Sequence, residues 1–376
     1  MSRFSISVFL GIGCGLAGCH VVFSSKDTKD SADAPGDAVT NAIVDAQVDG
    51  SDTVANFAFI TDAKFDGNLG GSAGADAKCK EAAKGLLVGN FVAVIGTAAP
   101  YSALNLTAVT DTTGWIRTDR AFVADKSSDF SNRVRNAIVL NERGVRPTET
   151  TIWTGLGADG SPVAANCGGF TSVVTSGGGG VGDTSSLIAT LKAGTVGCDS
   201  KHHLLCISVG KPIPVSPLSP NGRKRIFLST TADFGNRGLG IYDDMCAQEA
   251  AGLAPGMFVA LLPTLTDSSL ARVGLPPETF FIRVDGSPVG SLAKTPLTFL
   301  NQHADSSFVD ARSIPQVWTG GSPNATSVLN ANCAGWGSTG ATGITGDPLH
   351  ARALAYQAAI SQSCPMLKRH IYCVEK

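Results

Sequence analysis

Cysteine is the residue type whose number and spacing could do the most chemistry in this sequence. Eight of the ten cysteines fall into two sets of four, with gaps of 88, 31 and 8 residues in the first set and 87, 31 and 9 in the second. Such cysteines could ligate zinc or form disulfides, but neither set contains a CxxC pair and no histidine pair stands beside them at zinc spacing. The sequence therefore predicts two disulfides per set and no metal. The members are Cys79, Cys167, Cys198 and Cys206, then Cys246, Cys333, Cys364 and Cys373.

Four cysteines can pair in three ways, and spacing alone leaves these alternatives open. One possibility is a nested pattern, which would tie a helix near the first cysteine to a strand that carries the last one. Closing a loop of that length stabilises a domain by roughly 4–5 kcal/mol in the chain-entropy model. Cysteines of an exported chain are expected to form disulfides, and the N-terminal residues predict export.

Ser72 is the first candidate for catalysis, because the letters GGSAG at 70–74 match the GxSxG nucleophile elbow. That elbow needs a buried strand before it and acid and base partners later in the chain. Loop-forming residues precede Ser72 instead, and the second half of the chain has no aligned serine. We therefore expect no enzyme activity from this motif.

Two histidines and two aspartates occupy matching positions. His203 and His370 each stand three residues before the last cysteine of a set and could act as acid, base or metal ligand. A histidine packed beside a disulfide is the favoured interpretation. Asp183 and Asp347 each follow a glycine, and Pro348 follows Asp347, which favours a helix N-cap over a loop that contacts a ligand or cation.

The N-terminal residues predict the compartment. In 1–19, Arg3 precedes an apolar run from Ile6 to Leu16 that is too short for a permanent membrane span and is typical of a secretory signal. The segment ends in the letters LAGC at Cys19, which resemble the bacterial lipobox, in which this cysteine carries lipid. We expect lipidation at Cys19 and a lipid-anchored protein of the bacterial cell envelope, at the outer membrane or cell surface. The alternative is an ordinary signal peptide.

Composition and charge divide the remainder and exclude one class of function. Residues 20–56 are rich in Asp, Ala and Ser and predict a disordered tether, and 210–224 contain four prolines and predict a semi-rigid spacer. The spacer separates domains 57–209 and 225–376, and we expect few contacts across it. The formal net charge of −2 lacks the basic excess of a nucleic-acid-binding protein.

The two domains are tandem repeats at an offset near 166 residues. FVA at 91–93 recurs at 258–260, and WTG at 153–155 recurs at 318–320. Apolar alternation predicts strands at 57–61 and 226–230, at 91–95 and 258–262, and at 202–209 and 369–374. Helical spacing predicts a buried stripe of Cys79, Ala82, Ala83 and Leu86 in repeat 1, matched by Cys246, Ala250 and Leu253 in repeat 2.

A family resemblance rests on these segments in their order along repeat 1. GADAKC at 74–79, FVA at 91–93, WTG at 153–155, NC at 166–167 and HLLCI at 203–207 resemble endostatin, a branch of the C-type lectin-like fold. They resemble more closely a bacterial lipoprotein domain family of unknown function. The resemblance covers both repeats, about 300 residues, although repeat 2 has GIYDDMC where repeat 1 has the GAD run.

The resemblance implies an α+β fold of two tandem C-type lectin-like domains. Each would have a twisted, mainly antiparallel sheet, helices and long loops stapled by two disulfides. Calcium and zinc do not carry over, because SPV at 161–163 and SPN at 322–324 lack an acidic partner and 20–60 contain one histidine. We expect no cofactor. The implied pairing is nested: Cys79–Cys206, Cys167–Cys198, Cys246–Cys373 and Cys333–Cys364.

These observations favour a non-enzymatic binding or adhesion protein with two modules on a lipid-anchored stalk. Its partners would be the membrane, through the lipid, and an unknown extracellular protein or glycan bound without Ca²⁺. A secreted hydrolase and a purely structural envelope protein are the alternatives. Loops on a rigid scaffold are where binding usually evolves. The candidate ligand loops contain Asp159, Ser161, Asp183, Ser322, Asn324 and Asp347.

Overall fold

The structure, a computed structural model, describes most of the two repeats. All described residues lie in one compact unit, Ala46–Lys376. Cys19 and the signal peptide, nearly all of the tether and most of the spacer lie outside the described residues, so the predictions for them stay predictions. No described helix is both long and apolar enough to cross a membrane. The described residues are 55–97, 107–174, 178–187, 190–210, 212, 223–253, 256–294, 296–309, 316–321, 331–351, 355 and 361–376.

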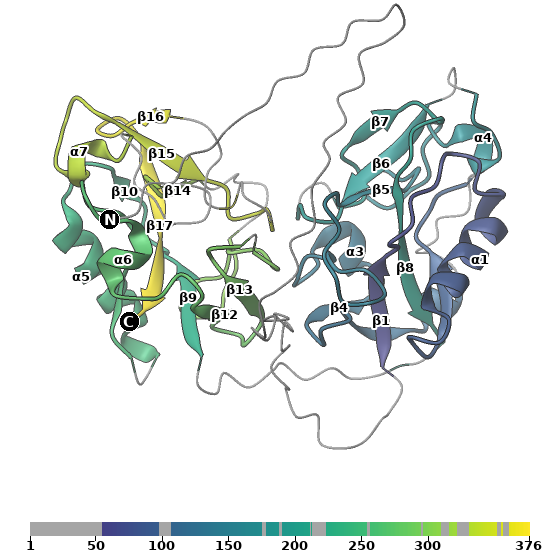
Figure 1. Ribbon diagram of the computed structural model, residues 1–376, viewed down its shortest axis with the longest axis horizontal. Helices are drawn as coiled ribbons and strands as arrows, with labels where there is room; N and C mark the ends of the chain where they lie inside the picture. The colour runs from purple at the N-terminus through teal and green to yellow at the C-terminus, as the bar shows by residue number, and fades with distance from the viewer. Residues whose placement is uncertain are drawn as a thin grey trace, which may run out of the picture. The chain divides into compact units, whose positions relative to one another are not determined.

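Each repeat contains one sheet (Figure 1). The first consists of β1 (Asn56–Ile60), β2 (Asn90–Ala93), β3 (Thr113–Ile116), β4 (Phe122–Lys126), β5 (Thr151–Trp153), β6 (Gly179–Asp183), β7 (Gly194–Val196) and β8 (His203–Val209). The second consists of β9 (Lys224–Leu228), β10 (Asp233–Phe234), β11 (Phe258–Ala260), β12 (Phe280–Arg283), β13 (Pro288–Ser291), β14 (Val317–Trp318), β15 (Thr342–Gly346), β16 (Ser361–Ser363) and β17 (Lys368–Glu375).

The two sheets have the same strand order. The first runs β4-β3-β1-β8-β5-β6-β7, with β2 also on β8, and the second runs β13-β12-β9-β17-β14-β15-β16, with β10 and β11 also on β17. Most neighbours are antiparallel, and β1 with β3 and β5 with β8 are parallel, as are their counterparts in repeat 2. The chain is therefore an α+β protein of two related repeats. The strands predicted at 202–209 and 369–374 are β8 and β17, which lie at the centre of the sheets.

The helices in the described residues are short. Apart from α1 and α5 they are single turns, so the strands and loops build most of each repeat. The α-helices are α1 (Gly71–Ala83), α2 (Thr107–Thr110), α3 (Asp129–Asn132), α4 (Cys167–Phe170), α5 (Leu239–Glu249), α6 (Ser269–Val273) and α7 (Cys333–Trp336), and a 3-10 turn, η3 (Ala250–Gly252), follows α5.

Helix α1 buries a narrow stripe against the sheet. Ala75, Cys79 and Ala83 recur every four residues, which places them on one face, and all three are buried. The predicted continuation of this stripe to Leu86 is wrong, because the helix ends at Ala83 and Leu86 is 53% exposed. Gly85 has a left-handed φ of 73°, which turns the chain away before Leu86.

The tryptophans of the WTG segments lie in the cores of the two repeats. Trp153 and Trp318 are fully buried, and each indole Nε1 donates to a backbone oxygen, of Phe65 at 2.7 Å and of Asp233 at 3.0 Å. A buried indole N–H needs such a partner, so the two tryptophans also fix the loop that precedes the main helix of each repeat.

The two repeats contact one another, which differs from the expectation based on the Pro-rich spacer. Phe299, Leu349 and Ala351 of repeat 2 pack into a core cluster made mainly by repeat 1. Arg146 Nη1 also donates to Pro296 O at 2.6 Å. Spacer composition constrains only the spacer itself, so apolar surface on the repeats can still meet.

Candidate functional site

Four disulfides cross-link the two repeats internally, two in each repeat. They join Cys79 to Cys206, Cys167 to Cys198, Cys246 to Cys373 and Cys333 to Cys364, the nested pairing that the resemblance implies. The outer bridge of each repeat ties the main helix to the central strand, and the inner bridge closes a loop. These eight cysteines are consumed by structural bonds.

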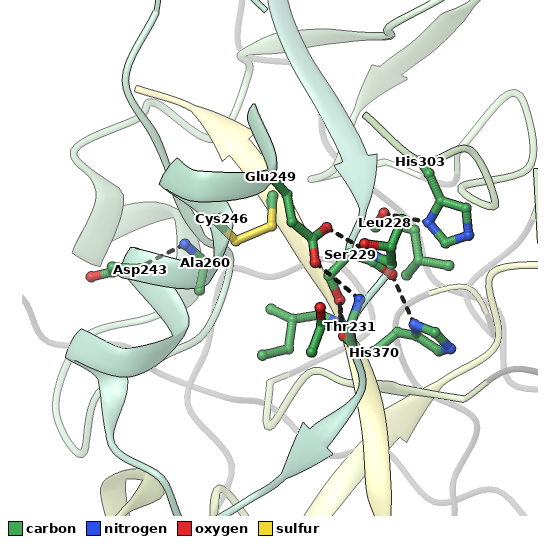
Figure 2. Close-up of a disulfide and its surroundings, with 12 residues drawn as sticks. Leu228, Ser229, Thr231, Asp243, Cys246, Glu249, Ala260, His303 and His370 are labelled. Carbon is green, nitrogen blue, oxygen red and sulfur yellow. Dashed lines mark hydrogen bonds between the residues drawn. A yellow bond between two sulfur atoms is a disulfide. The ribbon is translucent and has the colours of Figure 1, made fainter. Parts of the chain in front are cut away.

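An aspartate three residues before the first cysteine anchors the helix in both repeats. Asp76 Oδ1 accepts a hydrogen bond from Ala93 N at 2.8 Å, and Asp243 Oδ1 accepts one from Ala260 N at 2.9 Å. Figure 2 shows the second of these bonds beside Cys246. Repeat 2 lacks the GAD run of repeat 1, yet the D-x-x-C spacing that carries this bond is present in both repeats.

The two predicted histidines are packed against backbone carbonyls. His203 Nδ1 lies 2.6 Å from Thr61 O, and His370 Nδ1 lies 2.8 Å from Ser229 O. A carbonyl only accepts, so in the neutral ring Nδ1 carries the proton and Nε2 presents a lone pair. Burial lowers the pKa of both histidines below the ordinary value of 6.5, which favours this neutral form.

One further histidine, His303 of repeat 2, lies close to His370 and was not predicted from the sequence. His303 Nδ1 lies 2.8 Å from Leu228 O, and its ring centroid is 6.1 Å from that of His370. Figure 2 shows both imidazoles on the side of the sheet away from α5 and Cys246. No signal near His303 in the sequence points to this pair. Within the described residues, no group of three or more His, Cys, Asp or Glu side chains is placed to hold a metal ion.

Ser72 has none of the surroundings of a nucleophile elbow. It lies exposed in the first turn of α1, and the preceding strand, β1, ends at Ile60 with a loop between them. The elbow requires a sharp strand-to-helix turn that presents the serine hydroxyl above the sheet. The location of Ser72 therefore supports the interpretation of this motif as incidental.

Asp183 and Asp347 begin turns, and the predicted helix N-caps are wrong. Asp183 Oδ1 accepts hydrogen bonds from Ser185 N at 2.9 Å and Ser185 Oγ at 2.7 Å. Asp347 Oδ1 accepts from Leu349 N at 2.9 Å, and Asp347 Oδ2 lies 3.0 Å from His350 Nδ1. An aspartate that bonds the amide two residues on stabilises a turn by itself, so it does not require a helix.

The loop with Asp159 and Ser161 is exposed in repeat 1. Asp159 Oδ1 accepts hydrogen bonds from Ser161 Oγ at 2.6 Å and from Ser161 N at 3.1 Å. These bonds lower the pKa of Asp159 below its usual value, so the loop presents a carboxylate at neutral pH. The corresponding candidates in repeat 2, Ser322 and Asn324, lie outside the described residues.

Repeat 2 has an open hollow of about 480 Å³ at the N-terminal end of α5. Its lining combines a cation, an amide and apolar groups, and it is open to solvent. Arg237 is its charged member, 56% exposed, with Nε 3.3 Å from Asp233 Oδ2. The lining residues are Phe234, Asn236, Arg237, Ile241 and Pro365.

A buried tyrosine forms hydrogen bonds with the backbone of residues that line this hollow. The Tyr242 hydroxyl donates to Phe234 O and accepts from Arg237 N at 3.3 Å. Burial raises the pKa of Tyr242 to about 12, so the hydroxyl remains protonated and can donate at any physiological pH. Repeat 1 has Ala75 at the matching place, four residues before the first cysteine. The hollow is therefore supported by a residue that is particular to repeat 2.

The structure thus places the predicted residues in separate regions. His203 and His370 lie on the central strands β8 and β17, and the aspartate turns lie near the contact between the repeats. Asp159 lies on an exposed loop, and the hollow lies at the N-terminal end of α5. No family model matches this chain, and no curated protein matches it significantly.

Proposed function

We propose that this chain is a lipid-anchored protein of the bacterial cell envelope that presents two non-enzymatic binding modules to an extracellular protein or glycan. The observation that carries the proposal is one disulfide-stapled scaffold, built twice, with different exposed side chains on each copy. Repetition of the scaffold with variation of its loops is typical of binding proteins. We also propose that both repeats belong to the C-type lectin-like fold, in its endostatin-like branch.

The hollow of repeat 2 is the best supported ligand surface. Arg237 and Asn236 supply hydrogen-bond donors, and Ile241, 49% exposed, supplies an apolar wall. This combination fits a ligand with an acidic or polar group beside an apolar face, such as an acidic glycan or a peptide side chain. Asp159 and Ser161 on repeat 1 offer an acidic surface instead, so the two modules would differ in ligand preference.

Binding of the purified protein to arrays of glycans and matrix proteins tests this proposal. We expect retained binding in the presence of a chelator, because no carboxylate cluster suited to Ca²⁺ recurs in the two repeats. Arg237→Ala should weaken binding at repeat 2 about tenfold or more, the loss of one charge-assisted hydrogen bond. Lys294→Ala, an exposed cation in the turn after β13, is the matched control. Turnover of a substrate would instead favour the hydrolase alternative.

Membrane attachment has its own test. Cys19→Ala should release the protein from the membrane fraction or leave it unprocessed, because the acylated residue would be missing. Fatty-acid labelling of intact cells measures this directly. Label that persists on the Cys19→Ala protein would contradict the lipidation proposal and leave the binding proposal standing.

A further inference from the structure

The turns that begin at Asp183 and Asp347 lead into segments that pair across the two repeats. Each aspartate accepts a bond from the amide two residues on, Ser185 N or Leu349 N, so these positions correspond. By the same count, Ser186 corresponds to His350. These two residues form an antiparallel β-bridge with each other. A residue of one repeat is thus paired with its own counterpart in the other.

The hydrogen bonds around this bridge are reciprocal. Leu187 N donates to Leu349 O at 2.9 Å, and Ala351 N donates to Ser185 O at 2.7 Å. Exchanging the two repeats converts the first bond into the second. Contacts of this kind are made only at a two-fold axis, where residue i meets residue j and j meets i.

A second contact supports the same axis. Arg117 Nη1 donates to Ala137 O at 2.7 Å, and Arg283 Nη1 lies 3.4 Å from Phe299 O, so these carbonyls correspond. The residues just before them, Asn136 and Thr298, therefore correspond too. The hydroxyl of Thr298 donates to the side-chain oxygen of Asn136, and both residues are fully buried.

Apolar packing surrounds these polar contacts. Phe299 and Leu349, both 0% exposed, pack into the core cluster that contains Ile138 and Leu187 of repeat 1. The interface therefore combines fully buried apolar side chains with fully buried polar groups that are hydrogen-bonded. Large apolar contacts with satisfied polar groups are typical of obligate homodimers.

We propose that this face is an interaction surface of the homodimer type, and that its partner is the other repeat of the same chain. The interface itself holds the repeats together, and the Pro-rich spacer is dispensable for their association. Each of the four disulfides in the described part of the chain lies within a single repeat, so none of them joins the two halves. The ligand surfaces of the two modules are then held as a fixed pair.

Cleavage of the full chain tests the proposal. A recognition sequence for a site-specific protease, inserted after Pro217, allows the spacer to be cut in the folded protein. Analytical ultracentrifugation over a concentration series then measures the dissociation constant of the two fragments. We expect one particle with the mass of the uncut protein at micromolar concentration. Separation of the fragments at that concentration would overturn the proposal.

Two variants locate the association on this face. Arg146→Ala removes the donors to Pro296 O and Ala351 O, and Thr298→Val removes the hydroxyl donor to Asn136 while keeping the side-chain shape. Each should raise the dissociation constant about tenfold or more, since each leaves buried acceptors without a donor. Near-ultraviolet circular dichroism and thiol titration confirm that each variant is folded.

A neighbouring arginine provides the matched control. Arg143 is exposed and lies three residues before Arg146, so Arg143→Ala should leave the dissociation constant within about twofold. If Arg146→Ala and Thr298→Val both behave like Arg143→Ala, the fragments associate through a different surface and the proposal is wrong.

Discussion

Each repeat has an aspartate at the corresponding position, but the charged groups around it differ. Asp76 and Asp243 each accept a hydrogen bond from the second strand, at Ala93 N and Ala260 N. In repeat 2, Arg272 Nη1 and Nη2 also donate to the carboxylate of Asp243, at 3.0 and 3.1 Å. In repeat 1, burial raises the pKa of Asp76 against the effects of that backbone bond and of a lysine one turn on. Both repeats thus place an aspartate at this amide, and repeat 2 adds an ion pair with Arg272.

Backbone amides after the first strand show the same pattern. In repeat 1, Glu142 Oε2 accepts from Asp62 N at 2.9 Å. In repeat 2, Glu249 at the end of α5 accepts from Thr230 N at 2.7 Å and Thr231 N at 2.9 Å (Figure 2). In both repeats a glutamate provides the acceptor for amides after the first strand, and the two glutamates come from unrelated places in the sequence. The difference teaches that the scaffold conserves satisfied bonds rather than the residues that satisfy them.

Loss of the outer disulfide should have the largest effect and should be the same in both repeats. The bridges Cys79–Cys206 and Cys246–Cys373 both span 127 residues. In the chain-entropy model, removing either bridge lowers the free energy of unfolding by about 4–5 kcal/mol. Urea denaturation of the two double Cys→Ala variants measures it. Unequal losses above about 2 kcal/mol would show that the repeats depend on their staples to different degrees.

Removal of the anchoring aspartate should destabilise the two repeats to different extents. Asp76→Ala leaves one amide without its acceptor, at a cost of about 1–3 kcal/mol. Asp243→Ala also leaves Arg272 without its carboxylate partner, so its cost in unfolding free energy should be larger. Urea denaturation with Arg272→Met as a companion variant checks this. Equal losses for Asp76→Ala and Asp243→Ala would mean that the ion pair contributes nothing to repeat 2.

Acid should destabilise both repeats through their buried histidines. Burial depresses the pKa of His203 and of His370 below 6.5, so the unfolded chain binds the proton more readily. Their stabilising contribution is therefore complete above about pH 6.5 and is lost as the pH falls through the folded-state pKa. In His203→Asn and His370→Asn, the amide replaces the Nδ1 donor. Melting temperatures at pH 8 and 5 should differ less in these variants than in the parent protein.

The exposed loop of repeat 1 should show the smallest effect on stability. Asp159 bonds only within its own turn, to Ser161, and is fully exposed. Asp159→Ala should change the free energy of unfolding by less than about 0.5 kcal/mol. Array binding by the same variant then reports on the ligand surface alone. A loss of more than about 1 kcal/mol in urea denaturation would show that this loop is part of the scaffold.

Features that repeat along the chain could be predicted from the sequence. The cysteine spacing indicated two stapled repeats, and apolar runs placed the strands now seen as β1, β8, β9 and β17. These signals are local or covalent, and duplication displays each of them twice. The nested pairing followed from the family resemblance, because spacing alone left three alternatives open. The D-x-x-C spacing of Asp76 and Asp243 was present in the sequence but was hidden by the different residues around it.

Features that join distant segments were decided only by the tertiary structure. His303 and His370 lie close together because their rings hydrogen-bond to successive backbone carbonyls, those of Leu228 and Ser229, at the end of β9. Asp183 and Asp347 resemble helix caps in sequence, but they begin turns because the segments that follow pair with the other repeat. The contact of Asn136 with Thr298 joins residues 162 positions apart. Sequence patterns report the burial of each segment, whereas the partner against which a segment is buried depends on how the whole chain packs.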